Sequence, residues 1–292
     1  MDNTRPRNLE DLPNPIKYNT STESNALKSG NFWIGTGDVS KGPTYQSGFF
    51  NGYEAPAGGY VFYKNKTGDK TAVNTDLIFG LDPGNHVSYN SIDSSDTTRN
   101  VAPVNSDADG DMNNGITYSS SNGGTFVFDG LDDRIDVYTS PFYPGSWSSA
   151  DVTCCMFINP SNSQNGNIAT IENSWEIRCD SGGQVYFASN PWAWKGYASA
   201  TPNTWQMITF VHDWSGTQKG QIWINETKGY ETTINGALSS GSGYNSMRIM
   251  ARHCCGGEYK PGSIGPVLIY DKALSSSEIS QNFNAFRHRY GI

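Results

Sequence analysis

Short apolar segments separated by turns recur along the chain from residue 76 to the C-terminus. They are rich in β-branched and aromatic side chains, and turns follow at intervals of roughly 8–15 residues, which is typical of a sandwich. No alternation of strand and helix patterns points to a parallel sheet. The pattern predicts two packed antiparallel sheets. The predicted strands are Leu77–Leu81, Thr125–Asp129, Ile135–Tyr138, Val152–Ile158, Ile168–Glu172, Trp175–Cys179, Val185–Ala188, Trp205–His212, Gln221–Asn225, Met247–Ala251 and Ser263–Tyr270.

The composition suits an all-β chain and excludes some partners. The 292 residues include 32 glycines, 13% are aromatic and only 16% are charged, which favours strands joined by many turns. The net charge of −8 makes nucleic acid and anionic membrane surfaces poor partners, because an acidic surface repels phosphate groups. No apolar run approaches the ~20 residues of a membrane span. We therefore expect no nucleic-acid partner and no membrane insertion.

One amphipathic helix is predicted near the C-terminus. Ser275 and Glu278 have the spacing of a capping box, in which each residue satisfies a backbone N–H group of the other. Ile279, Phe283 and Phe286 follow at positions i, i+4 and i+7 and form one apolar stripe. We expect this stripe to pack either on the sandwich or on a partner subunit.

The first 75 residues differ in character from the rest. Residues 1–30 are polar and contain several prolines, which predicts an extended arm that orders against a partner. Residues 31–75 contain short aromatic and glycine-rich stretches, which predict a small β unit for docking or assembly. Residues 76–292 form the predicted sandwich. The first 17 residues lack the apolar segment of a signal peptide, so we expect the chain to fold in a cytoplasm.

Several motifs of the sandwich segment resemble the laminin-G-like, concanavalin A-like lectin family. They are the turn Asn113–Gly115, the segment Gly123–Asp133 with its Phe-Asp-Gly-x-Asp-Asp ending, the strand Val152–Pro160, the strand pair Trp205–Asn225, and the closing Ser263–Glu278. The resemblance implies an all-β, concanavalin-like, two-sheet jelly roll with a short C-terminal helix. It also implies a module that binds glycans or other surfaces without catalysis, although the fold hosts lectins, glycosidases and virion proteins alike.

Three stretches nearer the N-terminus resemble segments of tailed-phage structural proteins of the T4-like, cyanophage type. They are Gly30–Gly37, Gly48–Gly52 and Gly58–Tyr63. The resemblance implies a virion protein, either a capsid decoration or a tail or fibre component, that displays the sandwich for adhesion. Its partners would be other virion proteins through the arm, further copies of the chain, and glycans or a host surface. A bacterial carbohydrate-binding lectin and a glycosidase on the same fold are the alternatives.

An aromatic stretch is the candidate ligand site. Trp192, Trp194 and Tyr197 lie within a loop-like segment at residues 190–197. Aromatic faces stack on the C–H faces of sugar rings, so these three side chains could bind a glycan. A flap over the core, or a contact with a partner subunit, explains the same stretch equally well.

Calcium is the candidate cofactor. Asp107, Asp109 and Asp111 place three carboxylates at alternate positions, and calcium prefers clustered oxygen ligands in a flexible loop. The segment departs from the EF-hand pattern, because Met112 stands where that loop has glycine and Tyr118 where it has a bidentate glutamate. A solvated turn capped by its own aspartates is the alternative.

The motif of the family turn contains a second acidic group. Asp129, Asp132 and Asp133 could also hold calcium, but such residues more often satisfy backbone N–H groups of the turn itself. A glycosidase of this fold would carry a Glu-x-Asp-x-Glu strand, which the sequence lacks. Glu172 and Glu176 are close in sequence, but a predicted turn separates them. We therefore expect no enzymatic activity and no catalytic residue.

Overall fold

The computed structural model divides into two compact units, Met1–Thr71 and Ala72–Ile292. The structure describes residues 72–85, 87–89, 96–102, 108–142, 148–189, 193–240 and 246–292, together with the backbone of three strands in the first unit. Those strands form an antiparallel sheet in the order β1 (Ala26–Ser29), β2 (Phe32–Gly35) and β3 (Val61–Tyr63). β2 and β3 lie within predicted strand segments, whereas β1 lies within the predicted arm. The docking role of this unit stays a prediction.

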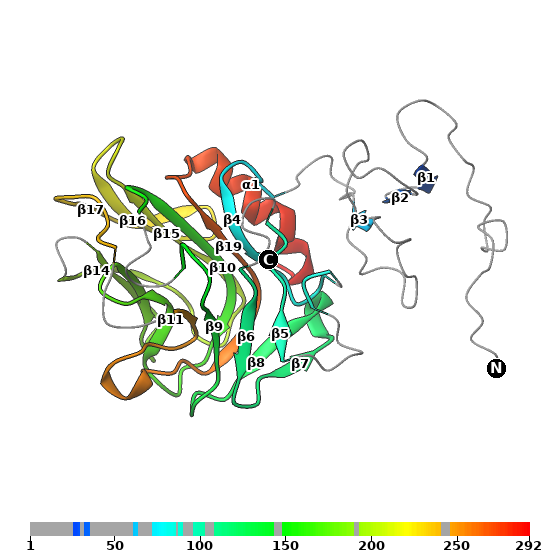
Figure 1. Cartoon of the computed structure of the whole chain (residues 1–292), viewed down its shortest axis with the longest axis horizontal. Coiled ribbons are helices and arrows are strands. Elements are labelled where there is room, and N and C mark those ends of the chain that lie inside the picture. Colours follow the sequence, from blue (N-terminus) through cyan, green and yellow to red (C-terminus); the bar gives the residue numbers. More distant parts are fainter. Residues whose placement is uncertain are drawn as a thin grey trace. The chain divides into compact units, whose positions relative to one another are not determined.

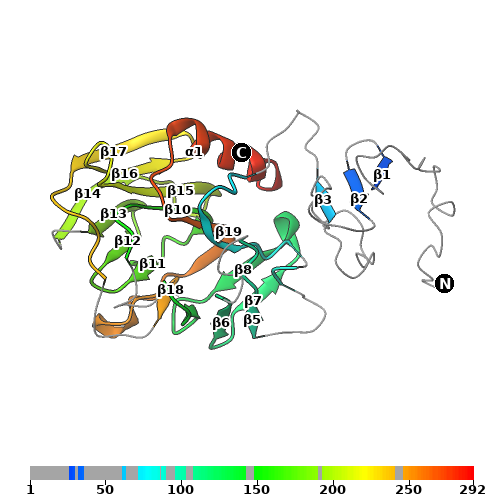
Figure 2. The same ribbon diagram turned by 45° about the horizontal axis from the view of Figure 1, so that its top comes forward.

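The second unit is a sandwich of two eight-stranded antiparallel sheets (Figures 1 and 2). We call the first the helix-covered sheet. Its main order is β17 (Thr227–Thr233), β16 (Lys219–Ile224), β15 (Gln206–Asp213), β10 (Val152–Pro160), β19 (Gly262–Tyr270), β8 (Thr125–Phe128) and β7 (Thr117–Ser119), and β4 (Leu77–Leu81) also pairs with β19. We call the second the open sheet. Its order is β14 (Ala193–Ser199), β13 (Gln184–Ser189), β12 (Trp175–Cys179), β11 (Gly166–Ile171), β18 (Met247–Ile249), β9 (Arg134–Val137), β6 (Gly110–Asn113) and β5 (Thr97–Thr98).

The predicted fold class is confirmed, and each of the predicted strands is present with small shifts at its ends. The strands that the sequence did not predict are β5, β6, β7, β14 and β17 in the sandwich. Except for β14, these strands are mainly polar, and several lie at sheet edges where only one neighbour holds them. The compact unit that contains the sandwich begins at Ala72. Val73 is buried in it, and its N–H group donates to Asn282 Oδ1 at 2.8 Å.

The main hydrophobic core fills the space between the sheets. Inward residues alternate with outward ones, so that β12 contributes Trp175, Ile177 and Cys179 to the core. Phe210 on β15 lies across from them, with its ring centroid 6.1 Å from that of Trp175 and 5.0 Å from that of Phe187 on β13. Aromatic residues of both sheets therefore meet at the centre of the sandwich.

A helix covers the outer face of the helix-covered sheet. Helix α1 (Ser276–Phe286) is followed by a 3-10 turn, η5 (Arg287–Arg289); the other 3-10 turns are η3 (Ser121–Gly123) and η4 (Cys255–Gly257). Ile279 and Phe283 are buried in a second apolar cluster with residues of β10 and β15, and Phe157 stacks on Phe283 with centroids 6.4 Å apart. The predicted apolar stripe thus packs on the sandwich (Figures 1 and 2).

The predicted capping box is confirmed at the start of α1. Ser275 Oγ accepts a hydrogen bond from the Glu278 N–H group at 3.4 Å, and Glu278 Oε2 accepts one from the Ser275 N–H group at 2.8 Å. Among the described helices, none is long and apolar enough to cross a membrane.

Loss of the capping hydroxyl should weaken the packing of α1 on the sandwich. We expect Ser275→Ala to lower the free energy of unfolding by about 1 kcal/mol, because it leaves a helix N-terminal N–H group without its acceptor. Ser276→Ala, one residue further along, is the matched control and should change stability by less than about half as much. Urea unfolding measures both, and equal losses would show that the cap contributes nothing specific.

Candidate functional site

The outer face of the open sheet carries polar side chains, and residues 250–261 cover its centre, so that Asp136, Asn167, Thr170 and Glu176 are buried. On each strand the residues between core positions point outward, as Asp136 does between Ile135 and Val137. Strand register aligns Asp136 with Arg248, Arg248 with Thr170, and Thr170 with Glu176. We call this surface the open face. Its residues are Arg134, Asp136, Asn167, Thr170, Glu176, Arg178, Gln184, Tyr186, Trp194, Tyr197 and Arg248.

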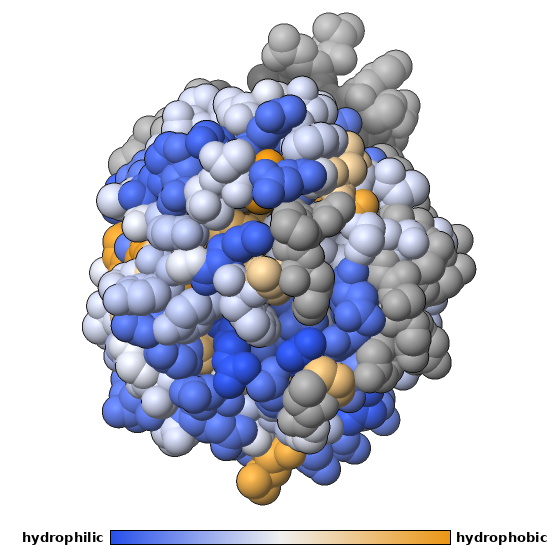
Figure 3. All heavy atoms as spheres, turned by 90° about the vertical axis from the view of Figure 1, so that its left-hand side faces the viewer, coloured by the Kyte–Doolittle hydropathy of each residue, from blue (hydrophilic) through white to orange (hydrophobic). Residues whose placement is uncertain are grey.

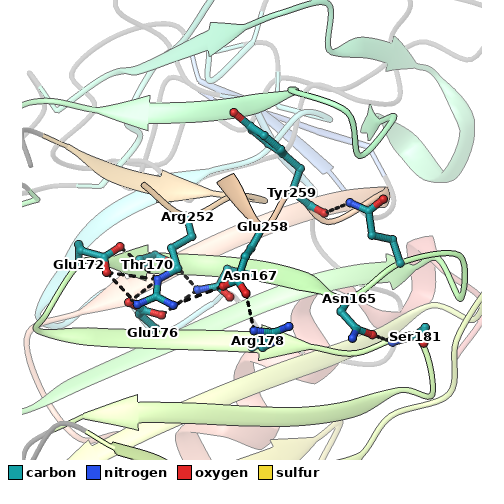
Figure 4. Close-up of polar contacts among 11 residues, drawn as sticks. Asn165, Asn167, Thr170, Glu172, Glu176, Arg178, Ser181, Arg252, Glu258 and Tyr259 are labelled. Carbon is teal, nitrogen blue, oxygen red and sulfur yellow. Dashed lines mark hydrogen bonds and ion pairs between the residues drawn. The ribbon is translucent and has the colours of Figure 1, made fainter. Parts of the chain in front are cut away.

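Glutamates and arginines form a network at the centre of the open face (Figure 4). Arg252 lies between two carboxylates, with Nη2 2.9 Å from Glu172 Oε1 and Nε 3.1 Å from Glu176 Oε1. Its Nη1 is 3.4 Å from Glu258 Oε2, and the other oxygen of Glu258 is 2.6 Å from Arg178 Nη1. The turn predicted between Glu172 and Glu176 is present, and it brings the two side chains together around one guanidinium.

The two central carboxylates are removed from solvent. Glu172 is 2% exposed and Glu176 is 0% exposed, so neither side chain can contact a ligand in this conformation. Burial, followed by the charge of Glu172, raises the pKa of Glu176 to about 8, while Arg252 and a hydrogen bond from Asn167 act in the opposite direction. Burial thus favours the protonated form of Glu176 over the ionised form. The charges of Arg252 and Arg178 are then balanced by those of Glu172 and Glu258.

This network fastens the segment at residues 250–261 onto the open sheet. The Asn167 N–H group donates to the Glu258 carbonyl at 2.8 Å, and the Arg252 N–H group donates to the Gly257 carbonyl at 2.6 Å. Lys260 is buried beside them, where burial lowers its pKa. Its Nζ donates to the carbonyls of Ser161, Gln164 and Asp180 at 2.8, 2.6 and 3.2 Å. The centre of the open face is therefore rigid rather than a cleft for chemistry.

A second ionic group lies nearer the β9 side of the open face. Asp136 is buried and accepts hydrogen bonds from Arg134 Nε at 2.8 Å, Arg248 Nε at 2.9 Å and Ser246 Oγ at 2.7 Å. Burial alone would raise the pKa of Asp136, but the Ser246 hydrogen bond and the two arginines together hold it below its usual range. This carboxylate is fully engaged and holds β9 and β18 together.

Aromatic side chains gather at the opposite end of the open face, on β14. Trp194 is 40% exposed and Tyr197 is 44% exposed, which leaves large aromatic surfaces in water. The Tyr197 ring lies 5.4 Å from that of Tyr186 on β13, and the Arg178 guanidinium lies 5.9 Å from the Trp194 ring. We call these four residues the aromatic cluster. Seen from the side of β14 and β17, the surface around this end is mainly hydrophilic, with scattered apolar residues (Figure 3).

The prediction that residues 190–197 form a loop is wrong for residues 193–197, which belong to strand β14. β14 pairs with β13, with a register shift between Tyr186 and Ala188, and this shift helps to place Trp194 and Tyr197 on one face. Gly196 lies against Tyr230, where an added Cβ would be 2.6 Å from the ring, so only glycine fits without rearrangement. Trp192 lies outside the described residues.

The predicted calcium loop is partly strand. Asp111 is exposed on β6 opposite Asp136, and one oxygen of Asp109 accepts from the Asn100 N–H group at 2.9 Å. Asp107 lies outside the described residues, so calcium binding by this group stays a prediction. The carboxylates of Asp129, Asp132 and Asp133, in contrast, do come together at their turn.

The pairing of Arg252 with the glutamates of the central network was not predicted from the sequence. Arg252 and Glu172 are 80 residues apart in sequence, and no local motif connects them. The available signal was weak: charged residues at alternate positions of apolar strands, as at Glu176 and Arg178, mark an outward face but not its partners.

The protonated state of Glu176 predicts a specific dependence of stability on pH. The pKa of Glu176 is about 8 in the folded chain and 4.5 ordinarily. The stability that the folded chain gains by protonating Glu176 is therefore complete below pH 4.5 and is lost as pH rises through about 8. Glu176→Gln keeps a neutral side chain and should therefore lose less Tm than the parent between about pH 6 and about pH 9. Thermal unfolding over this range measures the effect, and Glu231→Gln, at an exposed ion pair, is the control. Parallel curves for Glu176→Gln and the parent would contradict a protonated Glu176.

Comparisons with known proteins agree with the observed fold. The sequence model of the concanavalin A-like lectin/glucanases superfamily matches residues 129–280, a little more than half of the chain. No curated protein matches the sequence. Among solved structures, the binding domain of Paraclostridial mosquitocidal protein 1 is similar with a TM-score of 0.54 and 16% identity, over 73% of this chain and 53% of that one.

Two further structures share the fold. The ligand-binding domain of botulinum neurotoxin serotype D, in complex with N-acetylneuraminic acid, has a TM-score of 0.52 and 14% identity over 73% of this chain and 51% of that one. The Trypanosoma rangeli sialidase, in complex with sialic acid, has a TM-score of 0.52 and 11% identity over 73% and 33%. The chain thus spans about half the length of the two toxin domains. With its two antiparallel sheets and the matching sequence model, the chain belongs to the concanavalin A-like lectin/glucanases superfamily.

Proposed function

We propose that this chain is a non-enzymatic carbohydrate-binding protein, and that the aromatic cluster of the open face contacts the sugar. The observation that carries the proposal is the pair Trp194 and Tyr197, which are 40% and 44% exposed on one face of strand β14. Most large apolar side chains of a sandwich are buried, so two exposed aromatic residues beside Tyr186 and Arg178 mark a contact surface.

The chemistry of the cluster suits a sugar. Aromatic rings offer apolar faces to the C–H face of a pyranose, and their polar edges remain in water. Arg178 and the tyrosine hydroxyls are donors for the hydroxyl or carboxylate groups at the ring's edge. β14 is held by β13 on one side and by the contact of Gly196 with Tyr230, so the cluster loses little freedom on binding.

The fold relatives lend support. Two of the similar structures are named as complexes with N-acetylneuraminic acid and with sialic acid. Identities of 14% and 11% carry the fold alone, so this similarity suggests a sugar as the ligand class without assigning residues to it.

The burial of the central carboxylates supports a binding rather than a hydrolytic role. Hydrolysis of a glycosidic bond needs two carboxyl groups that flank the bond. Glu172 and Glu176 are the paired glutamates of the central network, and both are enclosed around Arg252. A glycosidase is therefore the weakest of the alternatives considered from the sequence.

We further propose that the chain is a virion structural protein, as a capsid decoration or a tail or fibre component, and that the sandwich is its adhesion domain. Support comes from the resemblance of three N-terminal stretches to tailed-phage proteins. The division of the chain into two units fits a separation between assembly and binding. A bacterial lectin is the second candidate, because the aromatic cluster would serve either protein equally.

Binding of glycans should depend on the aromatic cluster. We expect Trp194→Ala and Tyr197→Ala each to weaken binding of a glycan found by array screening by about tenfold or more, because each removes a stacking surface. Tyr138→Ala is the matched control, since Tyr138 is 43% exposed but lies after β9, towards the other end of the open sheet. Calorimetric titration with the selected glycan measures all three.

Three results would contradict the proposed site. They are the absence of any glycan ligand for the whole chain, unchanged affinity in both β14 variants, and a loss of binding in Tyr138→Ala alone. Matching Tm values for the variants and the parent would exclude unfolding as the cause of any loss.

Removal of residues 1–30 should separate assembly from folding. We expect the truncated chain to keep the Tm of the sandwich, because Ala72–Ile292 contains both apolar clusters. We also expect it to be absent from purified virions that contain the full chain, as measured by mass spectrometry. Absence of the full chain from virions would overturn the virion role and favour the bacterial lectin.

A further inference from the structure

Arg178 is the charged member of the aromatic cluster, and it lies in a row of side chains that crosses three strands. Strand register aligns Arg178 on β12 with Tyr186 on β13, and Tyr186 with Tyr197 on β14. The guanidinium carbon of Arg178 lies 5.9 Å from the centre of the Trp194 ring. The guanidinium therefore borders the exposed rings that the proposed function assigns to contact with a sugar.

Arg178 offers donors that its neighbours in the described part of the chain do not use. Its Nη1 is 2.6 Å from Glu258 Oε1, and the side chain is 27% exposed (Figure 4). Glu258 does not bind two nitrogens of Arg178, because its other oxygen lies 3.4 Å from Arg252 Nη1. Within the described residues, Nε and Nη2 of Arg178 form no hydrogen bond, and neither atom is buried. Both nitrogens are therefore available to an acceptor from outside the chain.

The two available nitrogens suit an acidic group. Nε and Nη2 are neighbours in the planar guanidinium, so the two oxygens of a carboxylate or sulfate group can accept from both at once. Such charge-assisted hydrogen bonds are roughly twice as strong as those to a neutral hydroxyl. Tyr186, the nearest tyrosine in the row, already donates its hydroxyl proton to Gln184 Oε1. An acid group at the edge of a sugar therefore gains more from Arg178 than a hydroxyl group does.

The acidic side chains around Arg178 are already engaged by the protein. The two oxygens of Glu258 are divided between Arg178 and Arg252, and Asp180 Oδ1 accepts from the Gln184 N–H group at 2.7 Å. The net charge of −8 repels acidic ligands at a distance. Selection of an acidic ligand therefore requires direct contact with Arg178.

We propose that the aromatic cluster selects an acidic sugar, one that carries a carboxylate or sulfate group, and that Arg178 binds this group through Nε and Nη2. The inference rests on the proposed function, because Trp194 and Tyr197 hold the sugar ring. The aromatic rings contact the apolar face of the sugar, whereas Arg178 distinguishes acidic from neutral sugars at the edge of the ring.

A glycan array on which acidic glycans stand beside their neutral counterparts, probed with the full chain, is the first test. We expect the acidic member of each bound pair to be preferred. The strongest ligand is then titrated by calorimetry beside its uncharged form, which is the methyl ester of a carboxylate or the desulfated sugar. The uncharged form should bind about tenfold more weakly or worse, because it loses charge-assisted hydrogen bonds.

Substitution of Arg178 should remove the preference. In Arg178→Gln we expect similar affinities for the acidic and uncharged forms, and in Arg178→Lys an intermediate preference, because lysine keeps the charge without the planar fork. Arg134→Gln is the matched control and should keep the full preference, since Arg134 also forms an ion pair on the open face, with Asp136 at 2.8 Å. Unchanged Tm values would exclude unfolding as the cause of a loss.

The outcomes separate this inference from the proposed function. Binding of neutral glycans alone, or equal binding of the acidic and uncharged forms by the parent, would overturn the inference and leave the sugar site intact. This comparison needs no variant. A preference that persists in Arg178→Gln would show that another group binds the acid, which also overturns the inference. The absence of any glycan ligand would remove the proposed function and the inference together.

Discussion

The rest of the structure depends on the burial of apolar side chains on three sheet faces. These are both faces of the helix-covered sheet and the inner face of the open sheet. The helix-covered sheet is apolar on both faces, because one packs on the open sheet and the other on α1. The open sheet is apolar only on its inner face. Since side chains alternate along a strand, every core residue of β9, β11, β12 and β18 obliges a neighbour to point outward. Packing of the core thus directs the alternate side chains of these strands to the open face. The residue types at those alternate positions determine which groups that face carries.

Those alternate positions are divided between ionic and aromatic groups, and the two have different consequences. A buried arginine with glutamate partners contributes little net stability, but losing one partner leaves an uncompensated charge and is strongly destabilising. The Arg252 network therefore fixes the conformation of residues 250–261 more than it strengthens the fold. The exposed rings of Trp194 and Tyr197 contribute little to folding, so their position on a rigid edge strand is best understood through what they could contact.

Much of the fold could be predicted from the sequence, because the interior strands and α1 carry long apolar patterns. β14 and β17 were missed for a physical reason: edge strands need only one apolar face or none, so their residues do not alternate clearly. The aromatic cluster, too, could be predicted from the sequence only in part. Trp194 and Tyr197 were identified by type, but Tyr186 and Arg178, which complete the cluster, are brought there by strand register alone. Arg252 pairs with Glu172, which lies 80 residues away in the sequence, and no local sequence pattern predicts a contact between residues so far apart.

The buried ammonium of Lys260 has a consequence for how this protein can change over time. Its three acceptors are main-chain carbonyls of Ser161, Gln164 and Asp180, and a carbonyl is supplied by any residue type. The side chains at those three positions can therefore be replaced without removing an acceptor from the lysine. The side chains of these loops at one end of the open sheet can therefore change during evolution, while the bonds from Lys260 keep the loop backbone in its present conformation.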